Sequence, residues 1–285
     1  MGEQRNSQSN EVVNVLSVDI EDYFQVEGFK GLISYSDWDR YEIRFQRGLE
    51  WLLQILDNFH VKATFFVLGW IAERYPQWVK EIARKGHEIG VHGYAHRWIE
   101  SLTRGEFKAD IQKTLQLLKD LGIEDISGHR APSFSITPKT AWAWDIVKEC
   151  GLVYDASLSA RYFRAGGYPW ANPNPGPQKC NTSNGRVMQL FPQAYLPLFD
   201  HIPFAGGGFF RLYPYWLTYW GIKTWNRRGV PIMVYVHPWE FDPEQPRLSV
   251  KPSRRFKHYV NLEINREKFA RLLQDFKFSP CREHL

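Results

Sequence analysis

Apolar residues recur with two different periods along the first 236 residues of the chain. Positions 12–19 (VVNVLSVD) are apolar and rich in β-branched residues, which predicts a first strand that ends on an acidic residue. Positions 44–59 carry apolar residues three and four apart, from Phe45 to Leu56, which predicts an amphipathic helix. Further strands are predicted at 62–68, 87–92, 152–154, 187–190 and 231–236, and further helices at 75–85, 103–121 and 137–150.

Capping residues mark several of these boundaries. Thr103 and Glu106 have the spacing of a capping box, and Gly122 follows the predicted end of that helix. Pro138 stands at the first position of the next helix, and Gly151 closes it. Strands that alternate with helices imply parallel βα units, which right-handed crossovers wind into a barrel or a doubly wound sheet.

Polar residues that can carry chemistry stand at or just after the predicted strand ends. These residues are Asp19, His92, Arg130, Asp155 and His237. Their position favours a barrel with its site at the C-terminal mouth, and 285 residues are enough for one such domain. We therefore expect an α/β fold, a distorted (β/α) barrel in a single domain with a C-terminal extension.

Three segments depart from the alternation. Residues 1–10 are polar and are expected to form a disordered tail, which leaves 11–240 for the barrel domain. Residues 162–184 are rich in Pro, Gly and Asn, which predicts a long loop on the substrate side. Residues 241–285 begin with a basic stretch interrupted by Pro and end with a predicted helix at 265–276. We interpret them as an extension packed on the same domain.

The composition excludes several classes of protein. Hydrophobic residues make up 44% and charged residues 24%, which excludes general disorder. The net charge of +5 comes from scattered Lys and Arg, with no run typical of a nucleic-acid partner. No segment has the roughly 20 apolar residues of a membrane span, and the first ten residues lack the apolar core of a signal peptide. Three widely spaced Cys argue against a disulfide framework and a thiolate zinc site, so a cytoplasmic location is expected. A position peripheral to the inner membrane stays open, because nothing in the sequence decides whether the substrate is a lipid-linked precursor.

His92 and His96 stand four residues apart directly after a predicted strand, so both imidazoles can face one metal ion. Alone, such a pair is more often a surface or packing feature. The acidic cluster Asp19, Glu21 and Asp22 strengthens the metal interpretation, because catalytic metals take three protein ligands and keep a fourth position open. The alternative for the cluster is a solvated turn or a helix cap. Two imidazoles and a carboxylate suit Zn²⁺, and Co²⁺ or Ni²⁺ fit the same ligands.

Two more residues could take part in proton chemistry. Arg130 can pair with a carboxylate through two bonds, although a structural salt bridge is about as common a role. His237 could act as a general acid near neutral pH, or could be a hydrogen-bonded residue at the rim of the barrel.

The order of these features resembles the polysaccharide deacetylase family, also called the NodB-homology family or carbohydrate esterase family four. An acidic cluster after the first strand is followed by HxxxH, RxPS, an Asp after a Tyr, and a late strand that ends in His. The order covers roughly 12–240 and is far more specific than any one motif. The tail, with HPWEFDPEQPR and HYVNLE, resembles the branch associated with exosortase and exopolysaccharide gene clusters in bacteria.

The resemblance implies a barrel of the NodB type and a role for each matched position. It makes Asp19 the catalytic base, with Arg130 orienting it, and His237 the acid that protonates the departing amine. It places an acidic neighbour of Asp19 on the metal together with His92 and His96.

The acidic metal ligand is either Glu21 or Asp22, because this chain has Asp-Ile-Glu-Asp where many family members have two adjacent Asp. Glu21 would share the face of Asp19 if strand geometry continued. Asp22 could swing back if the chain turned, and its shorter side chain is closer to the usual ligand. We slightly prefer Asp22.

Other residues are candidates for contact with the substrate. The resemblance implies that the backbone near Ser133 helps to bind the oxyanion and that Asp155, with Tyr154, supports the site near His237. The 12 Trp, 14 Tyr and 19 Phe include flat faces on which sugar rings could stack. Candidates for this groove are Trp170, Trp239, the segment 206–211 with Arg211, and, less favoured because they lie in a predicted helix, Trp142 and Trp144.

Three functional hypotheses follow. The leading one is a metal-dependent hydrolase that removes N-acetyl groups from amino sugars of a bacterial polysaccharide, in exopolysaccharide biosynthesis. The second keeps the fold and the metal but changes the substrate to a small cyclic or linear amide. The third is a glycan-binding protein without catalytic activity, suggested by the unusual Asp-Ile-Glu-Asp segment.

Overall fold

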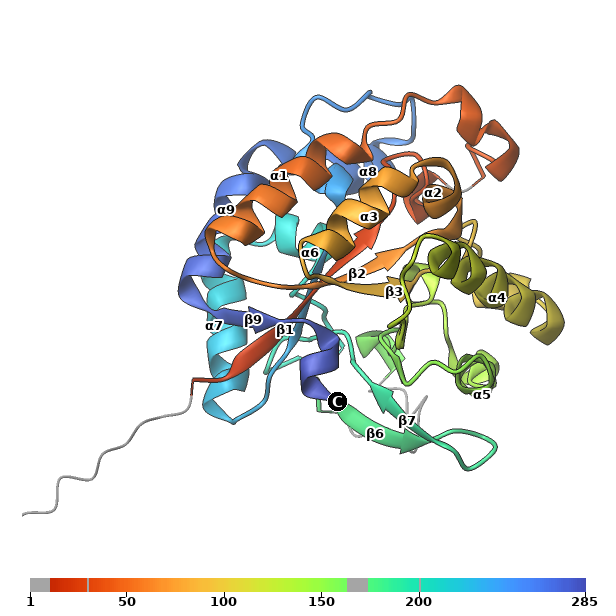
Figure 1. Cartoon of the computed structure of the whole chain (residues 1–285). Coiled ribbons are helices and arrows are strands. Elements are labelled where there is room, and N and C mark those ends of the chain that lie inside the picture. The colour runs from red at the N-terminus through yellow and green to blue at the C-terminus, as the bar shows by residue number, and fades with distance from the viewer. Residues whose placement is uncertain (1–10, 30, 163–173, 200) are drawn as a thin grey trace, which may run out of the picture.

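The computed structural model describes residues 11–29, 31–162, 174–199 and 201–285. Its centre is one sheet with the strand order β6-β7-β5-β4-β3-β2-β1-β8, and β9 pairs with the first residues of β1 (Figure 1). The strands are β1 (Val13–Ile20), β2 (Thr64–Val67), β3 (Glu88–Val91), β4 (Gly128–His129), β5 (Tyr154–Asp155), β6 (Gln178–Asn181), β7 (Val187–Leu190), β8 (Met233–Val236) and β9 (Lys277–Ser279). Every pair is parallel except β6 with β7.

The sheet forms the predicted distorted barrel. The chain after β7 returns to β8 through a bridge between Gln193 and Met233, and a second bridge joins Gly206 to Tyr235. These isolated bridges close the barrel on the side where a regular ladder is missing. The expected fold class is therefore confirmed. The closure between the chain after β7 and β8 has only isolated bridges, whereas the other neighbouring strands form ladders.

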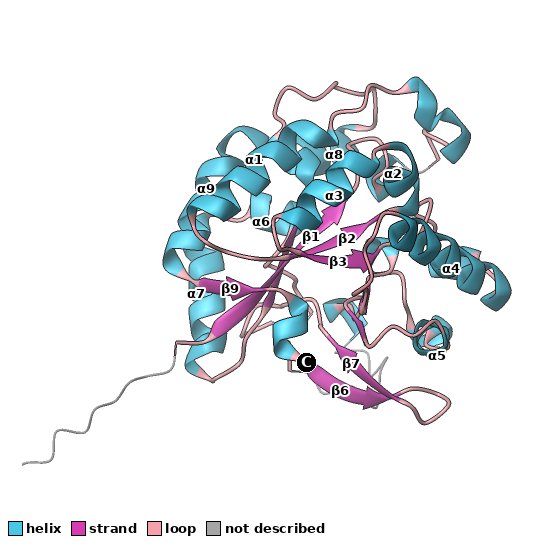
Figure 2. Ribbon diagram, viewed as in Figure 1, coloured by secondary structure: helices cyan, strands magenta, loops and turns pink. Residues whose placement is uncertain are grey.

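Helices cover the outside of the sheet (Figure 2). They are α1 (Phe45–Asn58), α2 (Gly69–Arg74), α3 (Pro76–Arg84), α4 (Arg104–Asp120), α5 (Ala143–Glu149), α6 (Gly207–Leu212), α7 (Tyr215–Arg227), α8 (Pro252–Tyr259) and α9 (Leu262–Asp275). In the described part of the chain, none of them is long and apolar enough to cross a membrane.

Local sequence accounts for several helix boundaries. The Thr103 hydroxyl accepts a hydrogen bond from the Glu106 amide, and the Glu106 carboxylate accepts one from the Thr103 amide, which completes the predicted capping box of α4. Gly122 and Gly151 follow α4 and α5 with φ values of 84° and 86°, the left-handed conformation that glycine adopts without strain. The predicted helix at 137–150 is instead a short 3-10 turn followed by α5.

The sheet separates two groups of buried apolar side chains. Leu16, Val18 and Ile20 face the helices and belong to the large outer core. Val15 faces the other way, into a small cluster that fills the inside of the barrel and includes Phe66, Tyr154, Phe191, Met233 and Cys281. By the same alternation, Asp19 faces the inside of the barrel at the C-terminal end of β1.

Strands β1 and β8 bring the two ends of the chain together. Their register pairs Val18 with Val236, so Asp19 and His237 are the next residues on two adjacent strands. Next to them, α1 packs against the 3-10 turn η7 (Pro238–Phe241), and a Cβ on Gly48 would lie 1.8 Å from the carbonyl oxygen of Pro238. Gly48 therefore permits a close approach of α1 to the turn that follows His237.

Residues 241–285 supply α8, α9 and β9. β9 lies parallel to the start of β1, and α9 contacts both η7 and α7. The buried Lys268 of α9 donates hydrogen bonds to the carbonyl oxygens of Arg211 and Tyr213. This segment thus packs on the barrel. The boundary at residue 240 stays a prediction, and the tail at 1–10 lies outside the described residues.

Candidate active site

Glu21, His92 and His96 form a group that could hold a metal ion, with one ligand atom from each lying within 4.8 Å of the others. Glu21 Oε2 lies 2.8 Å from His96 Nε2 and, among the described residues, makes no hydrogen bond of good geometry. An ion would satisfy this buried oxygen, which otherwise carries a desolvation cost. The donor set, two imidazoles and one carboxylate, fits a catalytic divalent cation.

Hydrogen bonds around His92 prepare it as a ligand. Its Nδ1 lies 2.8 Å from the carbonyl oxygen of Arg130, and donation to that oxygen leaves the Nε2 lone pair for a metal. Burial, followed by the neighbouring His96, lowers the pKa of His92 well below its usual value, so the ring is neutral. Burial raises the pKa of Glu21, but His96 and His237 outweigh burial and hold that pKa below its usual value.

The loop from His92 to His96 is fixed by its neighbours. The Gly93 carbonyl accepts a hydrogen bond from the Gly69 amide at 2.8 Å, and the Tyr94 amide donates to Asp110 Oδ2 at 2.8 Å. Gly93 has a φ of 71°, and a Cβ there would lie 2.9 Å from Asp110 Oδ2. The turn that brings the two imidazoles together thus depends on glycine at this position.

Asp22, the ligand that we slightly preferred from the sequence, faces away from this group. Its Oδ2 accepts hydrogen bonds from the amides of Arg44 and Phe45 at 2.6 and 2.9 Å, and its Oδ1 accepts one from the Tyr23 amide at 2.7 Å. Asp22 therefore caps the N-terminus of α1. The preference for Asp22 was wrong because both of its oxygens already serve this helix end, and the geometry selects Glu21.

Asp19 is held from one side by Arg130. Arg130 Nη1 donates to Asp19 Oδ1 at 2.5 Å, while its Nε donates to the Ala156 carbonyl oxygen at 3.1 Å and its guanidinium lies 4.3 Å from the centre of the Phe66 ring. Arg130 is fully buried and Asp19 almost so. This arrangement leaves Asp19 Oδ2 directed at His237, whose Nε2 is 3.8 Å away.

His237 lies between acidic groups on both sides of its ring. Its Nε2 is 3.2 Å from Glu21 Oε1, and its Nδ1 is 3.1 Å from Glu240 Oε2. Glu240 Oε1 in turn accepts a hydrogen bond from Arg211 Nε at 2.8 Å. Burial lowers the pKa of His237, but Glu240 and then Glu21 outweigh burial and raise it to about 9. Burial raises the pKa of Glu240, but His237 and Arg211 outweigh it and lower the pKa to about 2.

Glu240 is the residue at this site that sequence analysis overlooked. It stands three residues after His237, and its Oε2 also accepts a hydrogen bond from the His237 amide at 2.9 Å. The signal was present in the His-Pro-Trp-Glu sequence, because an acidic side chain at the third position of a turn that starts with Pro commonly reaches back to the cap residue.

Trp239 and Arg211 do not line a sugar groove. Trp239 is only 5% exposed and stacks between His237, at a ring distance of 5.6 Å, and His258, at 4.3 Å. Arg211 is 2% exposed and binds Glu240 and the carbonyl oxygens of His258 and Val260. Both predictions of substrate contact were wrong, because these side chains are buried supports for His237.

Asp155 lies elsewhere than expected. It is fully buried, its Oδ2 is 2.6 Å from His129 Nδ1, and its Oδ1 accepts hydrogen bonds from Trp144 Nε1 and the Ser157 amide, both at 2.8 Å. The Ser157 hydroxyl accepts a hydrogen bond from the Ala131 amide at 2.7 Å. Asp155 therefore supports the chain next to Arg130, and the expectation that it stands near His237 and the substrate is corrected.

Ser133 is the substrate candidate that remains exposed. It has a φ of 56° and Phe134 has one of 53°, so two consecutive residues adopt the left-handed conformation. Strained backbone of this kind is common at functional sites. The role of the Ser133 backbone at an oxyanion stays a prediction. Trp170 and much of the proposed loop at 162–184 lie outside the described residues.

Two protein-family models match the chain. One, described as polysaccharide deacetylase, matches residues 39–154, which include His92, His96 and Arg130. The other, described as a domain of unknown function (DUF3473), matches residues 159–285, which include His237 and Glu240.

Similar proteins include a peptidoglycan deacetylase and a peptidoglycan deacetylase-like protein. The peptidoglycan deacetylase of Helicobacter pylori is 31% identical over 111 residues, which are 39% of this chain and 37% of that protein. The peptidoglycan deacetylase-like protein FGM2 of Gibberella zeae is 28% identical over 172 residues, 53% of this chain and 50% of that protein. The chain thus spans half or less of the length of these relatives.

The fold is also found among solved structures. A protein from Mycobacterium smegmatis that is provisionally described as a polysaccharide deacetylase aligns over 96% of this chain and 90% of its own, with a TM-score of 0.62 and 19% identity. At this identity the likeness shows the shared fold.

Proposed function

We propose that the chain hydrolyses N-acetyl groups of amino sugars in a polysaccharide, a proposal that the match of residues 39–154 to the polysaccharide deacetylase model supports. The observation that carries the proposal is the position of His237 Nε2, 3.8 Å from Asp19 Oδ2 and 3.2 Å from Glu21 Oε1. A proton donor, a proton acceptor and a member of the candidate metal group thus meet around one point at the barrel mouth.

In this proposal Asp19 is the general base. Its Oδ2 takes a proton from the attacking water, while Arg130 holds Oδ1 and compensates the buried charge. His237 is the general acid, and its Nε2 delivers a proton to the departing amine nitrogen. Glu240 binds Nδ1 and so keeps Nε2 directed at the reacting atoms. Asp19 thus accepts the proton of the water and His237 donates a proton to the amine, and each side chain is held by its own partner.

Glu21, His92 and His96 would hold the divalent cation, most suitably Zn²⁺, with Co²⁺ or Ni²⁺ compatible with the same donors. When bound, such a cation supplies Lewis acidity toward the amide carbonyl and the nucleophilic water. The three side chains are positioned by the end of β1 and by the loop after β3. The Arg130 carbonyl that orients His92 belongs to the same residue that holds Asp19, so base and ligand are supported together.

The resemblance of residues 241–285 to a branch found in exopolysaccharide gene clusters extends the proposal to a bacterial exopolysaccharide. The test is acetate release by the purified chain, loaded with Zn²⁺, from N-acetylhexosamine oligomers and polymers. We expect turnover by the wild type, loss of about 10³-fold in kcat for Asp19→Asn, and retained glycan binding by that variant.

Other outcomes would favour the alternatives. Acetate or ammonia release from small amides, with none from any glycan, would indicate an amidase on the same fold. Glycan binding that Asp19→Asn leaves unchanged, with no turnover by the wild type at full metal occupancy, would indicate a binding protein.

A further inference from the structure

The second half of the chain has a strongly asymmetric charge. Two long stretches, 201–239 and 245–262, contain no Asp or Glu. Between them, Glu240 and Asp242 are buried in pairs with Arg211 and Arg44, which leaves only Glu244 exposed. The basic residues of the two stretches are Arg211, Lys223, Arg227, Arg228, Arg247, Lys251, Arg254, Arg255 and Lys257.

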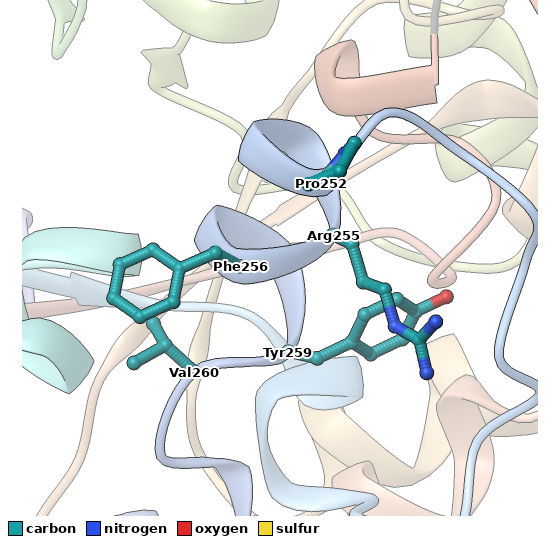
Figure 3. A pocket seen from close by; sticks show the side chains of 5 residues that line it. All are labelled: Pro252, Arg255, Phe256, Tyr259 and Val260. Atoms are coloured by element: carbon teal, nitrogen blue, oxygen red, sulfur yellow. The ribbon is translucent and has the colours of Figure 1, made fainter.

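Helix α8 presents the densest part of this charge. Residues 251–257 (KPSRRFK) are all exposed, and only His258 and Tyr259 at the end of the helix are buried. A shallow hollow of about 350 Å³ lies over this helix, lined by Pro252, Arg255, Phe256, Tyr259 and Val260. Figure 3 shows Phe256 and Val260 on one side of the helix and the Arg255 guanidinium beside Tyr259 on the other. Phe256 is 59% exposed although it is a large apolar residue.

More exposed apolar side chains come from the elements that contact α8. Arg211 binds the carbonyl oxygens of Lys257, His258 and Val260, so Leu212 at the end of α6 lies next to the end of α8. Leu212 is 41% exposed. Phe29, in the 3-10 turn before Leu32, contacts the His258 ring at 4.5 Å, and Leu32 is 51% exposed.

This surface lies at the mouth of the barrel. His258 of α8 stacks on Trp239, which stacks on His237. We call the exposed residues Leu32, Leu212, Lys251, Arg254, Arg255, Phe256 and Lys257 the mouth-side surface.

We propose that the mouth-side surface rests on an anionic lipid bilayer. Lys and Arg next to a membrane are attracted to anionic head groups, and Trp and Phe are favoured at the interface between head groups and acyl chains. Leu32 and Leu212 distinguish this occupant from an acidic polysaccharide, because aliphatic side chains gain free energy from burial in lipid but offer no flat face to a sugar ring. Docked in this way, the barrel mouth opens at the membrane surface.

Vesicle co-sedimentation of the full chain tests the proposal. We expect the wild type to sediment with vesicles of phosphatidylcholine that contain about 30% phosphatidylglycerol, to stay in solution with pure phosphatidylcholine, and to bind less as salt is added. Lys251→Gln with Lys257→Gln should reduce the partition coefficient roughly fivefold per charge removed. Leu212→Ser with Phe256→Ser should reduce it at least tenfold.

Matched controls separate this surface from general effects. Lys80→Gln with Lys119→Gln removes the same charge from exposed positions on α3 and α4, and Val153→Ser removes an exposed apolar side chain just before β5, at the opposite end of the barrel. Both controls should bind vesicles like the wild type, and every variant should keep the acetate release of the wild type on a soluble substrate. If the wild type released no acetate, the proposed function would be contradicted. Vesicle binding would still test the membrane proposal, because the sedimentation assay does not depend on acetate release.

Two outcomes would overturn the proposal. One is a wild type that does not sediment with anionic vesicles, or surface variants that bind them as well as the controls do. The other is binding to an acidic polysaccharide such as alginate that Lys251→Gln with Lys257→Gln abolishes, with no binding to vesicles.

Discussion

Glu240 Oε2 lies 3.1 Å from His237 Nδ1, and a second hydrogen bond joins the same oxygen to the amide of His237. His237, the proposed general acid, and Glu240, which binds it, are thus parts of one short turn at the end of β8. Arg211 fixes the other oxygen of Glu240, so the carboxylate cannot rotate without losing a buried ion pair.

Glu240→Gln should lower kcat by about 10- to 100-fold with little change in KM, because His237 would lose its aligned, charged partner while the ring itself remains. Metal content, measured by elemental analysis, should not change. Glu244→Gln is the control, since its side chain is 80% exposed four residues later. Equal kcat values for the two variants would contradict the role of Glu240.

Glu21→Gln and Asp22→Asn should separate the metal ligand from the helix cap. Glu21→Gln should reduce zinc affinity by at least tenfold with little loss of stability. Asp22→Asn should keep the metal and lower the free energy of unfolding by about 1 to 2 kcal/mol, because it weakens three hydrogen bonds to backbone amides. Zinc titration and urea unfolding measure the two effects, and loss of zinc from Asp22→Asn alone would reverse the assignment.

Gly48→Ala should destabilise the protein by about 3 kcal/mol or more, since the new methyl group would overlap the carbonyl of Pro238. Any folded fraction should also have a reduced kcat, because the displaced turn carries Glu240. Gly105→Ala is the comparison on another helix, where a Cβ meets no atom within 4 Å. That variant should be as stable as the wild type or slightly more so.

His87 should make the protein sensitive to mild acid. Burial lowers its pKa to about 4, and its Nδ1 accepts a hydrogen bond from the Ala63 amide. The pKa of His87 is lower in the folded protein than in the unfolded chain, so the neutral ring stabilises the fold. This stabilisation is complete above about pH 6.5 and is lost as the pH falls toward 4. The loss should reach up to about 3 kcal/mol in urea unfolding.

His87→Gln should remove most of this pH dependence. His60→Asn, at an exposed position with a φ of 53° that Asn tolerates, should retain it. Identical pH profiles for the wild type and His87→Gln would show that other groups are responsible.

The sequence predicted the barrel because its strands have strong local signals. β1, β3 and β8 are short, largely apolar runs that end at or next to candidate site residues, and their parallel order follows from the helices between them. Helix α7 was overlooked because YWLTYWGIKTWNR carries aromatic residues on several sides, and Trp and Tyr favour helices weakly. Trp225 is buried against Tyr195 while Trp216 is exposed, and the sequence pattern does not distinguish these two positions.

The site was partly predictable for a similar reason. The spacing of His92 and His96 is local information, and the structure brings both rings together with Glu21 in a group that could hold a metal ion. The role of Asp22 depends on the start of α1, 22 residues later, and that of Arg211 on Glu240, 29 residues later. The periodicity of the sequence does not indicate such pairings. Asp22, predicted as a metal ligand, therefore proved to be a helix cap, and Arg211, predicted as a sugar contact, proved to be part of a buried ion pair.

The register between β1 and β8 has a consequence for assembly of the protein. Asp19 and His237 meet only because Val18 pairs with Val236 across more than 200 residues of sequence. A slip of one residue would turn His237 to the other face of the sheet, into the helix layer, while most backbone hydrogen bonds could form again. Under the proposed function, catalytic activity would therefore report misassembly that circular dichroism would miss, because a chain with native secondary structure and a shifted register would not bring His237 opposite Asp19.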